Sequence, residues 1–169
     1  ASQVITRGVV VRVPGKVNLQ LSVGPLGSDG FHEVVSVFQA ISIFDDVTVR
    51  HAPEGAGITL TASGGTSHGV PLDSSNLAYR AAQIMIDRFH LSPDIEIDIK
   101  KDIPVAGGMA GGSADAAAVL VGLDALCELD FLLCVEQGHF ADLLEVVLHR
   151  IGSGASHRDG LDRLVRVID

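Results

Sequence analysis

The stretch that decides the fold is Pro104-Val-Ala-Gly-Gly-Met-Ala-Gly-Gly-Ser-Ala114, in which four of the eleven residues are glycine. It follows Ile95–Lys100 (IEIDIK), whose strict alternation predicts a strand with one buried face. It precedes an Ala- and Val-rich segment that predicts a helix from Ser113 to about Leu126. Glycines let the backbone turn its N–H groups inward, and the helix start adds unpaired N–H donors and the positive end of a dipole. The unit therefore predicts a loop that binds a polyphosphate.

Three commoner glycine motifs do not fit this loop. No Lys follows the glycines, as a Walker A loop requires, and Met109 and Ala110 break the GxGxxG spacing. Ser113 is followed two residues later by Asp115 rather than Gly, which excludes a hydrolase nucleophile elbow. The remaining alternative is a tight turn with Ser113 as an ordinary N-cap. Because a turn needs only one or two glycines, the local pattern favours phosphate binding.

Elsewhere in the chain, strands gather early and helices gather late. A helix is predicted from Asn76 to His90, with N-cap oxygens offered by Asp73, Ser74 and Ser75. A third amphipathic helix is predicted near His139 to Ile151. The remaining predicted strands are 9–13 (ending at Pro14-Gly15), 17–23, 34–44, 47–51 and 58–62, with a turn-rich loop at 24–30. This order predicts an α+β fold rather than a regularly wound α/β sheet.

Composition narrows the possible partners. The chain has 169 residues, enough for one domain with its own core, and a formal net charge of −9 that makes nucleic-acid binding a poor expectation. No apolar run approaches the ~20 residues of a membrane span, and the N-terminus lacks a signal-peptide pattern. The cytoplasm is therefore the expected location. No His or Cys spacing predicts a metal site.

In its order of residues the glycine loop resembles the ATP-binding loop of the GHMP kinases. Three further segments resemble the same family: Val13–Leu19 (VPGKVNL), Asp29–His32 (DGFH) and Ser75–Leu77 (SNL). Together they are similar to the branch of the family that phosphorylates 4-diphosphocytidyl-2-C-methyl-D-erythritol, because the other branches lack the DGFH segment. The resemblance runs from about Val10 to about Leu129.

This resemblance implies both a fold and an activity. Residues 1–131 would form the GHMP kinase N-terminal ATP-binding domain, with the ribosomal protein S5 domain 2-like α+β fold, and residues 132–169 a divergent helical tail of the same domain. The family's C-terminal ferredoxin-like domain has no counterpart in the chain. The implied reaction transfers the γ-phosphoryl group of ATP, with Mg²⁺, to the 2-hydroxyl of the cytidine diphosphate-linked methylerythritol in non-mevalonate isoprenoid precursor biosynthesis. The implied partners are these two small molecules, with neither nucleic acid nor membrane.

The resemblance also implies roles for individual residues. Lys16 would be the catalytic lysine, and Asn18, Phe31 and His32 would contact substrate. Phe31 stands where the family has Tyr, so it keeps the ring face for stacking and loses the hydroxyl. Asn76 and Lys101 would lie near the nucleotide, although each is also compatible with a capping or solvent-facing role. The implied ATP-binding residues are Pro104, Val105, Ala106, Gly107, Gly108, Met109, Ala110, Gly111, Gly112, Ser113 and Ala114.

Besides the missing C-terminal domain, one departure from the family pattern matters for activity. The family's general base is an Asp after the third helix, and Gly154 falls at that position. Asp159 and Asp162 lie nearby, but as solvated charges on a short amphipathic tail they are poor replacements. The alternative hypothesis is accordingly a catalytically inactive remnant of such a kinase, at most a weak nucleotide binder. For Asp115, pairing with the helix dipole is at least as good an expectation as a role with Mg²⁺.

Overall fold

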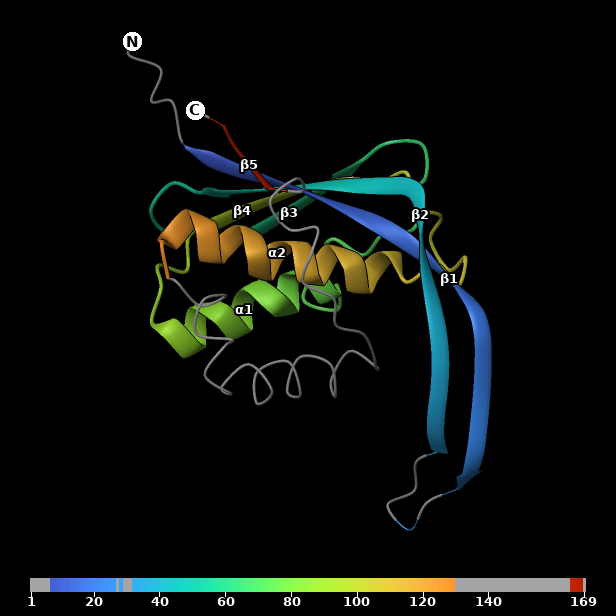
Figure 1. The fold of residues 1–169 in the computed structure, drawn as a ribbon. Helices are drawn as coiled ribbons and strands as arrows, with labels where there is room; N and C mark the ends of the chain where they lie inside the picture. The colour runs from blue at the N-terminus through green and yellow to red at the C-terminus, as the bar shows by residue number, and fades with distance from the viewer. Residues whose placement is uncertain (1–6, 27, 29–31, 130–164, 169) are drawn as a thin grey trace.

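The computed structural model describes residues 7–26, 28, 32–129 and 165–168. The elements follow in the order β1 (Gly8–Leu26), β2 (His32–His51), β3 (Ile58–Ser63), α1 (Leu77–Phe89), β4 (Ile95–Lys100), α2 (Gly111–Cys127) and β5 (Val165–Ile168) (Figure 1). The strands form one sheet in the order β3-β4-β2-β1-β5, in which β3 and β4 are parallel and the other neighbours are antiparallel. The predicted α+β class is confirmed.

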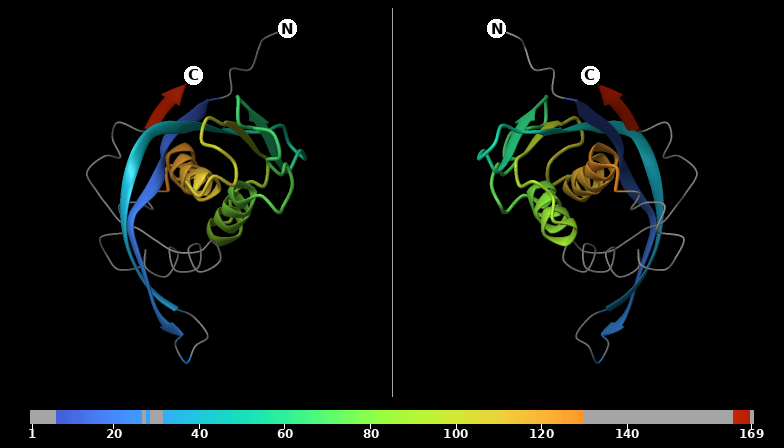
Figure 2. Two further views of the ribbon diagram at one scale, coloured as in Figure 1. Left: turned by 90° about the vertical axis from the view of Figure 1, so that its right-hand side faces the viewer. Right: turned by 90° about the vertical axis from the view of Figure 1, so that its left-hand side faces the viewer.

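Both helices pack on one face of the sheet, inside its curve (Figure 2). The reason is visible in β4, where Ile95, Ile97 and Ile99 are fully buried and the residues between them are not. Such alternation gives a strand one apolar face, which the helices cover. Helix α2 lies close against the sheet at Gly122, where an added Cβ would lie 2.7 Å from Val49 Cγ2.

The first two strands are longer than predicted. Strand β1 does not stop at Pro14-Gly15 but continues through it, with a shift of register against β2 between Pro14 and Lys16. A bulge tolerates proline because the residue there needs no ladder N–H. Strand β2 likewise spans both the predicted 34–44 and 47–51 strands, and β1 extends through Leu26 into the segment predicted as a loop. The two strands together form a long hairpin that reaches beyond the helices (Figure 1).

Both helix starts differ from the prediction by a few residues. The side chain of Asn76, rather than Asp73, Ser74 or Ser75, caps α1 by accepting from the Ala78 N–H at 2.8 Å. Helix α2 begins at Gly111, so Ser113 lies in its first turn and is not its N-cap. The predicted strands at 58–62 and 95–100 are confirmed.

The predicted helix at 139–151 lies outside the described residues. At the end of the chain, β5 pairs antiparallel with β1, so the prediction of a helical tail for 132–169 is wrong for Val165–Ile168. Within the part of the chain that the structure describes, no helix has the length and apolar character needed to cross a membrane.

Candidate active site

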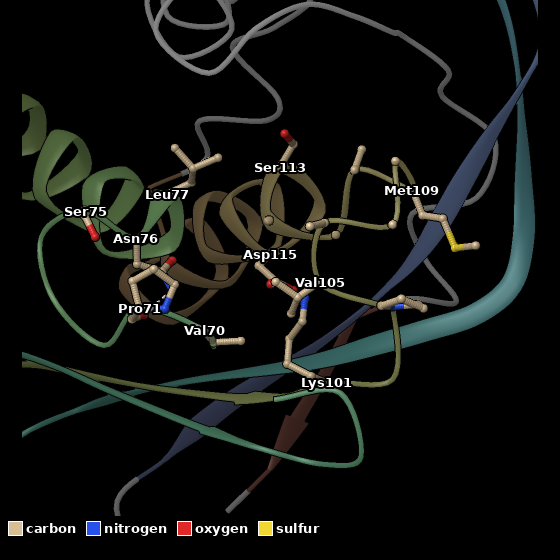
Figure 3. Close-up of a pocket in the computed structure, with 17 residues that line it drawn as sticks. Val70, Pro71, Ser75, Asn76, Leu77, Lys101, Val105, Met109, Ser113 and Asp115 are labelled. Atoms are coloured by element: carbon tan, nitrogen blue, oxygen red, sulfur yellow. Dashed lines mark hydrogen bonds and ion pairs between the residues drawn. The ribbon is translucent and has the colours of Figure 1, made fainter. Parts of the chain in front are cut away.

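The glycine loop leaves β4, passes through Pro104–Ala110 and enters α2, and it forms one side of a pocket of about 330 Å³. Segments that precede α1 and the start of α1 form the other side (Figure 3). The lining residues are Val70, Pro71, Ser75, Asn76, Leu77, Lys101, Pro104, Val105, Ala106, Gly107, Gly108, Met109, Ala110, Gly111, Gly112, Ser113 and Asp115. Of the predicted loop residues, Ala114 is not among them.

Every second residue in the middle of this loop has a left-handed backbone. The φ angles are 59° at Ala106, 72° at Gly108 and 57° at Ala110. Where left-handed residues alternate with right-handed ones, successive N–H groups turn toward the same side and form an anion-binding concavity, and the positive φ angle at every second position here fits that pattern. Two of the three positions hold alanine, whose Cβ makes this conformation unfavourable by about 1–2 kcal/mol. The loop therefore keeps its shape against a local backbone preference, as functional loops often do.

Two of the other three glycines of the loop, Gly107 and Gly111, allow close packing and have no positive φ angle. A Cβ on Gly111 would lie 3.0 Å from Ile103 Cγ2 and 3.1 Å from Lys101 Nζ. A Cβ on Gly107 would lie 3.1 Å from Pro104 Cβ. Gly112 is different, because its nearest neighbour would be Leu77 Cδ1 at 3.8 Å. The sequence-based idea that all four glycines provide backbone freedom was thus only partly correct.

The first turn of α2 supplies further donors for an anion. The N–H groups of Gly111, Gly112 and Ser113 are the first three of the helix and have no carbonyl partner within it. The first turn also carries no acidic residue that would neutralise the positive end of the helix dipole. The alternative reading, a simple tight turn, does not account for a pocket lined by both the loop and this helix end.

Beneath the loop, Lys101 lies between two carboxylates. Its Nζ is 2.5 Å from Asp45 Oδ2 and 2.7 Å from Asp115 Oδ2, and its side chain is only 2% exposed. Lys101 is therefore neither solvent-facing nor a cap. Asp45 also accepts the backbone N–H groups of Asp102 and Ile103 through Oδ1, at 2.7 and 2.9 Å. Figure 3 shows Lys101 and Asp115 pointing toward each other at the floor of the pocket.

Asp115 is the least satisfied member of this group. Among the described residues, no hydrogen-bond partner reaches its buried Oδ1. Burial raises the pKa of the Asp115 carboxyl to about 7, although Lys101 opposes the rise, and the charge of Asp45 adds to it. The earlier expectation of helix-dipole pairing misses this contact, since the side chain is directed at Lys101.

Lys16 contacts the same loop from β1. Its backbone N–H donates to Met109 O at 3.1 Å, and its Nζ donates to Gly108 O at 3.0 Å and to Asn18 Oδ1 at 2.6 Å. Asn18 in turn donates to Ser36 Oγ on β2 at 2.9 Å. Within the described residues these two bonds leave one of the three ammonium protons of Lys16 for a further acceptor.

His32 is not brought to the loop. It pairs with Leu26 at the far end of the hairpin, where its Nδ1 lies 2.8 Å from Gly24 O. Lys16 and Leu26 are ten residues apart on β1, so a rise of ~3.3 Å per residue puts His32 roughly 30 Å along the strand from Lys16. Phe31 and Gly154 lie outside the described residues.

Asn76 has a structural role that also shapes the pocket. Besides capping α1, its Nδ2 donates to Pro71 O at 2.7 Å, which holds the segment that carries Val70 and Pro71 against the helix start. Leu77 belongs to the apolar face of the helix predicted from Asn76 to His90, whereas Val70 and Pro71, which complete this apolar wall of the pocket, had no periodic signal in the sequence. Among the described residues, no three His, Cys, Asp or Glu side chains come together as metal ligands.

Comparison with known proteins agrees with this geometry. Residues 76–158 match the family described as GHMP kinases N terminal domain. The chain is 54% identical over 130 residues to the 4-diphosphocytidyl-2-C-methyl-D-erythritol kinase of Mycolicibacterium smegmatis, covering 76% of this chain and 39% of that protein. It is also 54% identical over 127 residues to the kinase of the same description from Rhodococcus jostii, covering 75% of this chain and 40% of that protein. The chain thus spans about two fifths of the length of these relatives.

Solved structures give the same result for the fold. A crystal structure of 4-(cytidine 5'-diphospho)-2C-methyl-D-erythritol kinase matches with a TM-score of 0.52 and 34% identity, over 69% of this chain and 40% of that one. Mevalonate diphosphate decarboxylase from Staphylococcus aureus matches with a TM-score of 0.57 and 16% identity, over 89% of this chain and 42% of that one. The second likeness concerns the fold alone.

Proposed function

This chain belongs to the GHMP kinase family, and we propose that it uses ATP to phosphorylate the 2-hydroxyl of 4-diphosphocytidyl-2-C-methyl-D-erythritol. The observation that carries this proposal is the joint occurrence of the glycine-loop pocket and Lys16 bound to that loop. The relatives from Mycolicibacterium and Rhodococcus are kinases for this compound. Because the chain spans about two fifths of their length, the activity and both substrates are transferred to it as a proposal.

The nucleotide side of the proposal rests on the loop. A pocket of about 330 Å³ lies at the lower end of the range of small-molecule sites. Backbone N–H groups of the loop and of the α2 start would hold the phosphate oxygens, and Val70, Pro71 and Leu77 offer an apolar surface for the base. ATP would enter as its Mg²⁺ complex, since Mg²⁺ is usually held by substrate phosphates with one or two carboxylates rather than by a dedicated protein cage.

Lys16 is the residue we assign to the chemistry. During transfer, the substrate 2-oxygen would bond to the γ-phosphorus, the bond from that phosphorus to the oxygen bridging to the β-phosphate would break and release ADP, and the hydroxyl proton would pass to solvent water. Negative charge is spread over the phosphoryl oxygens, and a cation held at the loop stabilises it. The two hydrogen bonds of Lys16 to Asn18 and Gly108 fix its ammonium group at the edge of the loop.

On the substrate side, we propose contacts from Asn18, Phe31 and His32. An aromatic face and an imidazole edge suit a pyrimidine base, and Asn18 lies next to Lys16. For Phe31 and His32 the proposal depends on the sequence pattern alone. His32 lies at the far end of the hairpin from Lys16, and Phe31 lies outside the described residues. A kinase that consumes cellular ATP would work in the cytoplasm.

The test is ADP release with MgATP and 4-diphosphocytidyl-2-C-methyl-D-erythritol, after ATP binding has been measured by calorimetry. We expect turnover, and a loss of about 10²–10³-fold in Lys16→Ala, the range found when a charge-stabilising donor is removed. Lys100→Ala, which truncates an exposed lysine of β4, is the matched control and should leave turnover unchanged. A folded chain that binds ATP without turnover would refute the kinase activity and favour a nucleotide binder without catalysis.

A further inference from the structure

The buried cluster of Asp45, Lys101 and Asp115 connects the two ends of the glycine loop. Asp45 on β2 accepts three hydrogen bonds, from Lys101 Nζ and from the N–H groups of Asp102 and Ile103, which lead into the loop. Asp115 lies on α2, into which the loop runs, and accepts from the same Nζ. One lysine thus ties the entry of the loop to its exit.

The charges of this cluster do not balance. Two carboxylates share one ammonium group, and the three side chains are almost completely buried. Asp45 is fully satisfied by its three donors, whereas Asp115 Oδ1 is buried without a partner in the described part of the chain. A buried carboxylate oxygen without a donor is costly when charged, and a proton on that oxygen removes the charge. Asp115 is therefore the site where a proton from solvent would be taken up.

The position of Asp115 makes its charge relevant to a bound anion. It lies two residues after Ser113, whose N–H is one of the free donors at the start of α2, and it lines the same pocket. The charged groups that face it are Asp45 from β2 and Lys101 from the segment after β4. The start of α1 contributes Leu77 and its N-cap Asn76, neither of which titrates, and β1 brings Lys16 to Gly108.

We propose that the polyphosphate of a nucleotide binds this loop with Asp115 protonated, so that the Asp45–Lys101–Asp115 cluster both positions the loop and makes nucleotide affinity depend on pH. The proposal rests on the proposed nucleotide binding and deepens it. Asp115 would affect binding in two ways, by holding the exit of the loop through Lys101 and by the charge that it carries beneath the phosphates. It is therefore a positioning residue.

The expected change of the Kd for ATP with pH follows from the fraction of chains in which Asp115 is protonated. With a pKa of about 7 in the free protein, roughly nine tenths of the chains are protonated at pH 6 and roughly one tenth at pH 8. If only the protonated form accepts the anion, Kd for ATP is about tenfold weaker at pH 8 than at pH 6. The terminal phosphate of ATP itself titrates near pH 6, so the Kd for ATP changes with pH for that reason too. At each pH, the wild-type Kd must therefore be compared with the Kd of a variant that has no titrating group at position 115.

The experiment measures Kd for ATP by calorimetry at pH 6 and pH 8 in the full chain, in Asp115→Asn and in Asp87→Asn. The last variant makes the same chemical change at an exposed site on α1. We expect the ratio of the wild-type Kd to the Asp115→Asn Kd to rise about tenfold from pH 6 to pH 8, while Asp87→Asn follows the wild type. Wild-type titrations near pH 7.5 in two buffers of different ionisation enthalpy should also report net proton uptake on binding, which requires no variant.

The inference would be overturned if the Kd for ATP depended on pH equally in the wild type and in Asp115→Asn, or if the wild type bound ATP without net proton uptake near pH 7.5. Either result would leave nucleotide binding intact. Absence of ATP binding at both pH values in a chain with a folded circular dichroism spectrum would overturn the proposed function, and this inference with it. If Asp115→Asn does not fold, the proton-uptake measurement on the wild type decides alone.

Discussion

Replacing Asp115 by Asn should change how the stability of the free protein depends on pH. The substitution keeps the shape of the side chain and an oxygen that can accept from Lys101, but it removes the group that titrates. Any constant loss or gain from the new amide is the same at every pH. The informative quantity is therefore the difference in unfolding free energy between wild type and variant, followed as a function of pH.

The magnitude follows from the shift of one carboxyl. Its pKa rises from an ordinary 3.8 to about 7 because burial outweighs the hydrogen bond and charge of Lys101. The folded state therefore holds this proton more tightly than the unfolded state, and the resulting stabilisation is complete below pH 3.8 and lost as the pH rises to about 7. Between pH 5 and pH 8 the wild type should lose about 2.5 kcal/mol relative to Asp115→Asn.

Urea unfolding at pH 5, 6, 7 and 8 measures this difference. The chain has one Tyr and no Trp, so far-UV circular dichroism is a better probe than fluorescence. Carboxylates that do not contact position 115 are the same in both proteins, so their contribution cancels in the difference. Parallel stability curves for the two proteins would refute the reasoning, because they would mean that Lys101 keeps Asp115 ionised despite its burial and its unpaired oxygen.

Two further pairs of substitutions, each a test and its control, probe the loop geometry by urea unfolding at one pH. Ala110→Gly removes a Cβ from a left-handed residue and should stabilise the fold by about 0.5–1 kcal/mol. The same change at Ala114, inside α2, should destabilise the fold by about 1 kcal/mol. Equal effects at both sites would contradict a left-handed backbone at Ala110. Gly111→Ala should destabilise by about 1–3 kcal/mol because its Cβ meets Ile103 and Lys101, while Gly112→Ala, which has space, should stay within ~1 kcal/mol of wild type.

The buried ion cluster could have been predicted from strand periodicity, although we did not predict it. Val47 and Val49 face the helices on β2, and Ile97 and Ile99 face them on β4. Continuing each alternation by one step toward the loop reaches Asp45 and Lys101, two opposite charges on the core face. The pairing register then places them opposite each other, since Val47 pairs with Ile99. Periodicity alone predicts that each charge faces the core, whereas their pairing depends on the register, which only the structure supplies.

Two other features of the structure could not be predicted from the local sequence pattern. The strand break predicted at Pro14-Gly15 follows a sound local rule, but pairing with β2 carries the strand past it through a bulge. The left-handed angles at Ala106 and Ala110 run against the preference of alanine and so had no signal in composition. By contrast, the strand–loop–helix unit was predicted correctly, because alternation, glycine content and helix periodicity all agree there.

The loop is held at three places, and this arrangement explains how a glycine-rich segment can act as a preformed site. Glycines lose more backbone freedom on ordering than other residues, so a loop fixed only by its ligand would bind weakly. Here Asp45 fixes the entry at Asp102 and Ile103, Asp115 fixes the exit through Lys101, and Lys16 fixes the middle at Gly108 and Met109. The ordering is therefore completed during folding, so in the proposed function the phosphates of ATP would meet a loop that is already in place. In the proposed function Lys16 would therefore serve twice, since the bonds that hold the loop also fix the ammonium group that we assign to the transferred phosphoryl group.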